Sequence, residues 1–162
     1  EWKGIDFSMF WQGVAKRDLW LDGLMFWGIS GGEWQSTGLK EHLDYYRPEN
    51  TTSVFGPNTN AYFPKMYMSK DMNQKVQTRY LQNGAYARLK NIQLGYTFPT
   101  QIINKLHMQK LRVYVSAENV LTITSLPSGF DPETTYSSYS DGNSGKTYPL
   151  QTTISFGLHA TF

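Results

Sequence analysis

The final stretch of the chain, Leu150–Phe162, alternates apolar and polar residues without interruption. A period of two is typical of a β-strand with one apolar and one polar face. A strand of a soluble protein usually has about 5 or 6 residues, whereas a strand that crosses a bilayer at a tilt needs about 9 to 11. The stretch is therefore long enough to span a membrane, and Phe162 adds an aromatic ring at its end, where a barrel meets the membrane interface. Taken alone, the stretch favours a membrane strand over the alternative, an edge strand of a soluble sandwich.

Three further stretches show the same alternation, so we expect four strands at about 2–14, 86–98, 111–122 and 149–162. In a membrane-spanning sheet, the apolar residues of each strand would face lipid. The residues predicted to do so are Ile5, Phe7, Met9, Trp11, Leu94, Tyr96, Val113, Val115, Ile154, Phe156 and Leu158.

Two cations interrupt this pattern, because strict alternation would place Arg88 and Lys90 on the apolar face. A charge at the centre of a bilayer costs about 2 to 4 kcal/mol, but little near the interface. We therefore expect these residues to lie at a rim of the membrane, or a bulge to intervene.

The connections between the strands are long, short and long, at about 15–85, 99–110 and 123–148. Outer-membrane barrels have long extracellular loops and short periplasmic turns, so the carboxyl terminus is expected in the periplasm. Such barrels need about eight strands or more to close. The chain also opens at Glu1 without an initiator methionine. We therefore expect it to be part of a longer protein, with the other strands upstream.

Local structure within the connections is also predicted. Apolar residues at helical spacing favour one short helix over about 39–46, with a stop at Arg47-Pro48, and a single helical turn over 102–106. Asn83-Gly84 is typical of a hairpin turn that would pair 77–82 with the next strand.

Composition and motifs exclude several classes of function. The net charge of +2 comes from scattered basic residues, which argues against a nucleic-acid surface, and the chain has no cysteine. No acid pair, nucleophile elbow or phosphate loop occurs, so we expect no enzyme and no cofactor. His42, His107 and His159 lack the spacing of metal ligands. The stretch 141–145 resembles part of a calcium loop but lacks the closing glutamate, so a plain turn is favoured.

The long connections are rich in aromatic residues, which can pack among themselves, form a protein interface or stack on sugar rings. All three alternatives stay open from the sequence alone. The candidates for contact with a protein lid or a substrate are Trp20, Trp27, Trp34, Tyr45, Tyr46, Tyr136 and Tyr139.

Several segments are informative through their order and spacing. They are 2–8 (WKGIDFS), 16–20 (KRDLW), 22–24 (DGL), 86–96 (YARLKNIQLGY), 111–122 (LRVYVSAENVLT), 129–133 (GFDPE) and 148–150 (YPL) with the terminal strand. Together they resemble the carboxyl-terminal end of the SusC/RagA family of TonB-dependent outer-membrane transporters. The resemblance implies an all-β fragment, the last four antiparallel strands of a transmembrane barrel of about 22 strands. It also implies two long extracellular loops, with the plug domain and the TonB-contacting segment in amino-terminal sequence that is absent here.

The family resemblance also implies partners. A SusD-like surface lipoprotein would act as a lid, TonB would drive import of oligosaccharides or peptides, and the barrel-assembly machinery would recognise the last strand. Gly157, Ala160 and Phe162 occupy the positions of that assembly signal. Two residues depart from the family's signal. Ala160 is smaller than the usual hydrophobic residue at its position, and Phe156 occupies the position before the glycine, where a polar residue is common.

The leading hypothesis is thus part of an active nutrient importer in the bacterial outer membrane. The alternatives are a soluble carbohydrate-binding β-sandwich and a passive porin-type barrel. In a barrel the apolar faces of the strands meet lipid, whereas in a sandwich they meet a second sheet.

Overall fold

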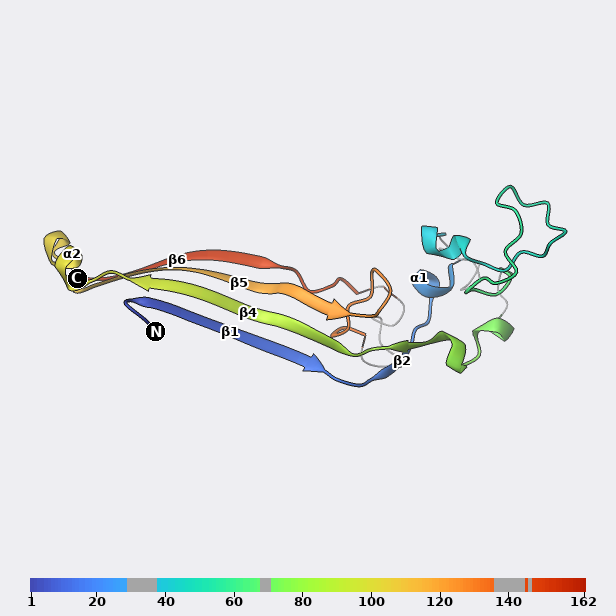
Figure 1. Cartoon of the computed structure of the whole chain (residues 1–162), viewed down its shortest axis with the longest axis horizontal. Coiled ribbons are helices and arrows are strands. Elements are labelled where there is room, and N and C mark those ends of the chain that lie inside the picture. The colour runs from blue at the N-terminus through green and yellow to red at the C-terminus, as the bar shows by residue number, and fades with distance from the viewer. Residues whose placement is uncertain (29–37, 68–70, 136–144, 146) are drawn as a thin grey trace. The chain divides into compact units, whose positions relative to one another are not determined.

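The computed structural model describes residues 1–28, 38–67, 71–135, 145 and 147–162, which form two compact units (Figure 1). The sheet unit consists of Glu1–Lys16, Ala85–Ser125 and Leu150–Phe162. The loop unit consists of Arg17–Gly84 and Leu126–Pro149. Each unit therefore combines segments that are far apart in the sequence.

The sheet unit is one four-stranded antiparallel sheet in the order β1-β4-β5-β6, which confirms the prediction of four antiparallel strands. Its strands are β1 (Ile5–Val14), β4 (Tyr86–Thr97), β5 (Lys110–Thr124) and β6 (Thr153–Thr161). Among the described residues the sheet is open, with β1 and β6 at its edges. It is therefore mostly β structure that does not close on itself.

The strand ends differ from the predicted bounds where the backbone turns. Trp2 and Ile5 exchange two backbone hydrogen bonds of 2.9 Å across Lys3 and Gly4. Lys3 and Gly4 have positive φ angles of 48° and 86° and form a turn, so β1 begins at Ile5. At the other extreme, β5 continues past the predicted end, to Thr124.

A β-bulge interrupts β4 between Leu89 and Asn91, so the prediction of an intervening bulge is confirmed. Lys90 is the extra residue, and the alternation reverses on either side of it. Leu89 pairs with Trp11 and so joins the apolar face, while Arg88 moves to the polar face. Arg88 is buried there, and its Nε donates a 2.8 Å hydrogen bond to the Thr122 hydroxyl.

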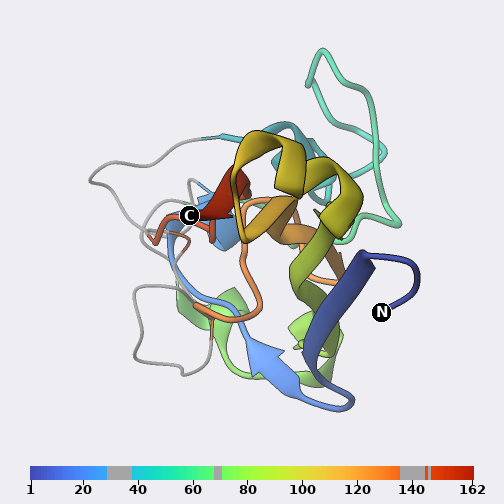
Figure 2. The ribbon, with the colours of Figure 1, turned by 90° about the vertical axis from the view of Figure 1, so that its left-hand side faces the viewer.

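The short connection contains α2 (Thr100–Ile103) and η5 (Asn104–Leu106), in agreement with the predicted helical turn. Ile103 is buried, and His107, in the left-handed conformation, ends the turn. Both chain termini lie at this end of the sheet (Figure 2). At the opposite end, Val14 faces Tyr86 and Tyr86 faces Thr124, so both long connections leave the sheet together.

The loop unit is built from short elements rather than long regular ones. They are β2 (Asp18–Trp20), α1 (Leu24–Trp27), η2 (Lys40–Leu43), η3 (Asp71–Gln74), η4 (Thr78–Tyr80) and β3 (Leu81–Asn83). The helix predicted over 39–46 is a single 3₁₀ turn, η2, at whose start the Leu39 N–H donates a 3.0 Å hydrogen bond to His42 Nδ1.

The predicted hairpin at Asn83-Gly84 is wrong, because β3 pairs with β2 and not with the strand that follows it. The Gly84 N–H donates a 2.6 Å hydrogen bond to the Arg17 carbonyl, which extends the β2–β3 pairing. A Cβ at Gly84 would also lie 2.6 Å from the Leu19 side chain. This glycine therefore permits the close packing of Leu19 instead of a tight turn.

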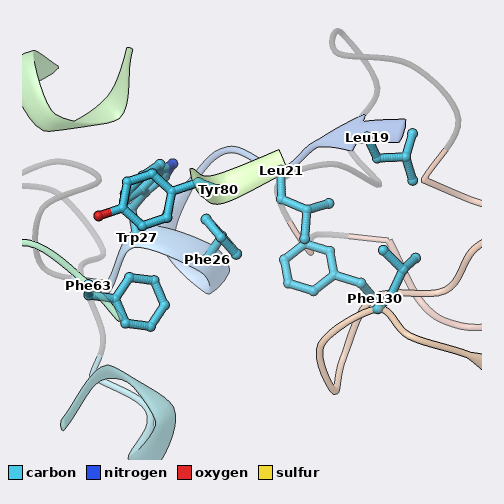
Figure 3. Packing of buried hydrophobic residues seen from close by; sticks show 8 residues of the cluster. Leu19, Leu21, Phe26, Trp27, Phe63, Tyr80 and Phe130 are labelled. Atoms are coloured by element: carbon cyan, nitrogen blue, oxygen red, sulfur yellow. The ribbon is translucent and has the colours of Figure 1, made fainter. Parts of the chain in front are cut away.

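Both long connections contribute to the hydrophobic core of the loop unit (Figure 3). The core residues are Leu19, Leu21, Phe26, Trp27, Phe63, Tyr80, Leu126 and Phe130. Trp27 is at the centre of the aromatic contacts, with its ring 5.0 Å from that of Tyr80 and 5.1 Å from that of Phe26, both edge-to-face. Burial raises the pKa of the Tyr80 phenol above its ordinary value.

Arginine side chains satisfy backbone carbonyls of the irregular segments. Arg47 is buried and donates to the carbonyls of Leu43 and Gly56, at 2.8 and 2.6 Å. Arg17 donates to the Pro132 carbonyl, a contact between the two long connections. Because irregular backbone lacks the ladder that pairs its polar groups, such guanidinium donors stabilise a loop unit of this kind.

We expect Trp27→Ala to disrupt the loop unit. Loss of a buried tryptophan side chain usually costs about 3 to 5 kcal/mol. In limited proteolysis of the full-length protein, the variant should be cleaved faster than wild type within residues 17–84. Tyr67→Ala is the matched control, since Tyr67 is 47% exposed. Equal cleavage of the two variants would contradict a core role for Trp27.

Candidate functional site

One face of the sheet is apolar across all four strands. Phe7, Leu94, Val115 and Phe156 are directly opposite one another in consecutive strands, and equivalent rows lie on either side. Directly opposed residues of antiparallel strands point to the same face. All residues predicted to face lipid therefore share this face, including Trp11, which pairs with Leu89 beyond the bulge.

This apolar face is uncovered in the part of the chain that the structure describes. Phe7 is 57% exposed, Ile154 63% and Phe156 84%. Large contiguous apolar surfaces of this kind are contact sites for lipid or for other protein, because water solvates them poorly. Contact with lipid itself stays a prediction at these residues.

The opposite face is polar and carries an ion pair that bridges three strands. Arg112 of β5 donates to Asp6 of β1 through Nε to Oδ1 at 3.0 Å and through Nη2 to Oδ2 at 2.5 Å. The pair passes over β4 at Gly95, where a Cβ would lie 2.5 Å from both Arg112 Nη2 and Asp6 Oδ1. Gly95 therefore makes room for a two-pronged ion pair between strands that are not neighbours.

This ion pair could not be predicted from the sequence, since its partners are 106 residues apart. The only local signal was a glycine inside an otherwise regular strand pattern, which can mark a close approach of another group. Which group approaches depends on the register of all three strands.

The residues of the predicted assembly signal lie on and beyond the edge strand β6. Gly157 is on the polar face opposite Tyr114, and Ala160 is on the apolar face opposite Leu111. Phe162 follows the strand and is 76% exposed. Recognition of these residues by the assembly machinery stays a prediction.

The aromatic candidates of the loops occupy different environments. Trp27 is only 1% exposed, so it is a core residue and not a contact residue, which corrects that prediction. Trp20 and Tyr45 are partly buried against the core, whereas Tyr46 is 40% exposed. Trp34, Tyr136 and Tyr139 lie outside the described residues, as does 141–144 of the calcium-like stretch.

The loop unit also contains a hollow of about 540 Å³ to which both long connections contribute. The hollow is lined by the rings of Phe26, Phe63 and Phe130 and also by the charged residue Glu41. Its volume is in the range of small-molecule sites, which combine apolar walls with a few polar groups. Sequence reasoning could not identify it, because its walls come from distant segments.

The described residues contain no group of three or more potential metal-ligating side chains. No helix among them is both long enough and apolar enough to cross a membrane.

Comparison with known proteins gives similarity over nearly the whole chain. No family model matches the sequence. TonB-dependent receptor P3 of Formosa agariphila is 27% identical over 99% of this chain and 15% of its own length. TonB-dependent receptor P26 of the same organism is 25% identical over 99% of the chain and 16% of its length. The chain thus spans about 15% of the length of these relatives.

Solved structures with the same fold include the RagAB peptide importer. Its open-open state matches with a TM-score of 0.65 and 22% identity, over 99% of this chain and 16% of that one. Its closed-closed state matches with a TM-score of 0.63 and 23% identity, over the same shares. The chain is therefore homologous to a segment of TonB-dependent receptors, as the sequence resemblance predicted. These relatives are described as receptors and as an importer rather than as enzymes.

We expect Gly95→Ala to destabilise the sheet through a clash with the ion pair. Overpacking of this kind typically costs about 1 to 3 kcal/mol. In a background with Asp6→Ala and Arg112→Ala, the same substitution should be nearly neutral, because the clashing groups are gone. Urea unfolding of the refolded full-length protein measures both. Gly38→Ala is the matched control, since no atom lies within 4 Å of its added Cβ. An equal cost of Gly95→Ala in both backgrounds would refute this role.

Proposed function

We propose that this chain, homologous to a segment of TonB-dependent receptors, forms the last four strands of the transmembrane barrel of an outer-membrane nutrient importer. The barrel would have about 22 strands, the others supplied by sequence upstream. The loop unit would lie on the extracellular side, and the short connection and carboxyl terminus in the periplasm.

The observation that carries this proposal is the continuous, uncovered apolar face of the sheet. The charged residues Asp6, Arg88, Arg112 and Glu118 all lie on the other face, and Lys90 is displaced into the bulge. A transmembrane barrel requires this division, because its outer surface meets hydrocarbon and its inner surface meets water and the plug.

The orientation is supported by the connections. Both long connections leave the same end of the sheet and fold together into one unit. In outer-membrane barrels the long connections are extracellular, and turns at the other end are short. The turn with α2 and the end of β6 would then be periplasmic.

For substrate and partners, we propose import of peptides or oligosaccharides beneath a SusD-like lipoprotein lid. The similarity in fold to the RagAB peptide importer supports peptides over oligosaccharides as the proposed substrate class. TonB would act through the amino-terminal part of the receptor, and nucleic acid is not expected as a partner. Of the predicted contact residues, Tyr46 is exposed on the loop unit and would serve lid or substrate contact, since rings are enriched in interface cores.

The alternative of a soluble carbohydrate-binding sandwich requires a second sheet over the apolar face. Within the described residues of the sheet unit, no second sheet covers it. A passive porin-type barrel would contain the same four strands. A plug domain in the upstream sequence would distinguish an importer from such a porin.

The membrane proposal is tested by Ile154→Arg in the full-length protein. An arginine facing the bilayer centre costs about 2 to 4 kcal/mol, so folded protein in the outer-membrane fraction should fall sharply. The matched control is Ser155→Arg, the next residue of β6, which points to the polar face. Fractionation and heat-dependent gel mobility measure both. Normal recovery of the Ile154→Arg variant as a soluble protein would refute the proposal.

The lid proposal is tested by affinity purification of the full-length receptor, which should co-isolate a surface lipoprotein. We expect Tyr46→Ser to weaken this association by at least about 1 kcal/mol if the ring is an interface anchor. Tyr67→Ser is the control, a similarly exposed loop tyrosine outside the predicted set. A receptor that purifies without a lipoprotein would exclude a lid contact for the loop unit.

A further inference from the structure

The terminal strand contains a second glycine over which a neighbouring side chain lies. Tyr114 of β5 is directly opposite Gly157 of β6, and a Cβ added to Gly157 would overlap carbon atoms and the hydroxyl of the Tyr114 ring. The ring therefore lies flat across β6 on the polar face. An aromatic ring placed over a glycine in this way shields the backbone of an edge strand.

Tyr114 is linked in turn to the ion pair on the same face. The Arg112 guanidinium carbon lies 4.9 Å from the centre of the Tyr114 ring, and Arg112 binds Asp6 over Gly95. A continuous series of contacts thus crosses all four strands, and at both glycines it passes where a side chain is absent. All of its side chains belong to the sheet unit.

The pattern of apolar residues cannot by itself determine the register of β6 on β5. A slip by one residue would turn every apolar residue of β6 to the polar face, but a slip by two would keep all faces correct. The polar-face positions of β6 are Thr153, Ser155, Gly157, His159 and Thr161, of which only Gly157 lacks a Cβ. After a slip by two, Tyr114 would meet Ser155 or His159 instead.

We propose that Gly157, which has no Cβ, leaves the space that the Tyr114 ring occupies, here called its seat, and that this contact sets the register of the terminal strand. This goes beyond the importer function and gives Gly157 a role distinct from direct recognition by the assembly machinery. Gly95 acts in the same way for β1, β4 and β5, since it is the only residue without a Cβ among the polar-face positions Asn91, Gln93, Gly95 and Thr97 of β4 beyond the bulge.

Suppression distinguishes the two roles of Gly157. In the full-length protein, Gly157→Ala should lower the ratio of folded to unfolded protein by about 5- to 30-fold, through overlap with the Tyr114 ring. Adding Tyr114→Ala should remove this effect, so that the double variant matches Tyr114→Ala alone. Ser155→Thr, which adds one methyl group two residues away on the same exposed face, should be nearly neutral. Heat-dependent gel mobility and circular dichroism measure the folded fraction.

Register itself can be measured by disulfide formation, because the chain has no cysteine of its own. Thr153→Cys should form a disulfide with Glu118→Cys, because these two positions are direct partners in the native register. The double exchange Gly157→Ser and Ser155→Gly moves the glycine by two residues along β6. Thr153→Cys should then form a disulfide with Ser116→Cys instead.

Two outcomes would overturn the proposal. One is a Gly157→Ala defect that persists unchanged with Tyr114→Ala, as direct recognition of the glycine requires. The other is a folded glycine-exchange variant that keeps the cross-link from 153 to 118. If the exchange variant does not fold, the suppression result decides alone. Recovery of the wild type as a soluble protein would refute the importer proposal, while both tests of the seat would still apply.

Discussion

The strict alternation of side chains along antiparallel strands is the constraint on which the rest of the molecule depends. Because directly opposed residues share a face, one register brings Phe7, Leu94, Val115 and Phe156 into a single apolar row. The same register gathers charge on the other face. The alternation of β4 reverses where a cation would otherwise enter the apolar face, and there the bulge at Lys90 turns Arg88 toward Thr122.

The two faces of the sheet place different demands on their residues. The apolar face needs only hydrophobic residues of adequate size, which many sequences supply. The polar face must hold charged groups close to backbone, and it does so with a two-pronged ion pair that satisfies both partners. Glycines at 95 and 157 provide the space, so specificity of strand pairing resides on the polar face.

The loop unit follows a third principle, since it has little regular structure to pair its backbone. Rings from both long connections pack around Trp27, and guanidinium groups such as Arg47 bind free carbonyls. Tertiary packing therefore overrides local signals here. The Asn83-Gly84 pair, typical of a hairpin turn, serves the close approach of Leu19, and the helical spacing after Thr37 yields only one 3₁₀ turn.

The sequence by itself determined the four amphipathic strands, the long, short and long order of their connections and the helical turn of 102–106. These features follow from periodicity and local chemistry, which act between residues close in the chain. For Arg88 and Lys90 the sequence left two alternatives open, a position at the membrane rim or a bulge, and the structure decided for the bulge. Only the tertiary structure decided the pairing of β2 with β3, the burial of Trp27, the Asp6–Arg112 ion pair and the place of Tyr114 over Gly157. Each of these joins distant segments, and their contact depends on register and packing that no local pattern encodes.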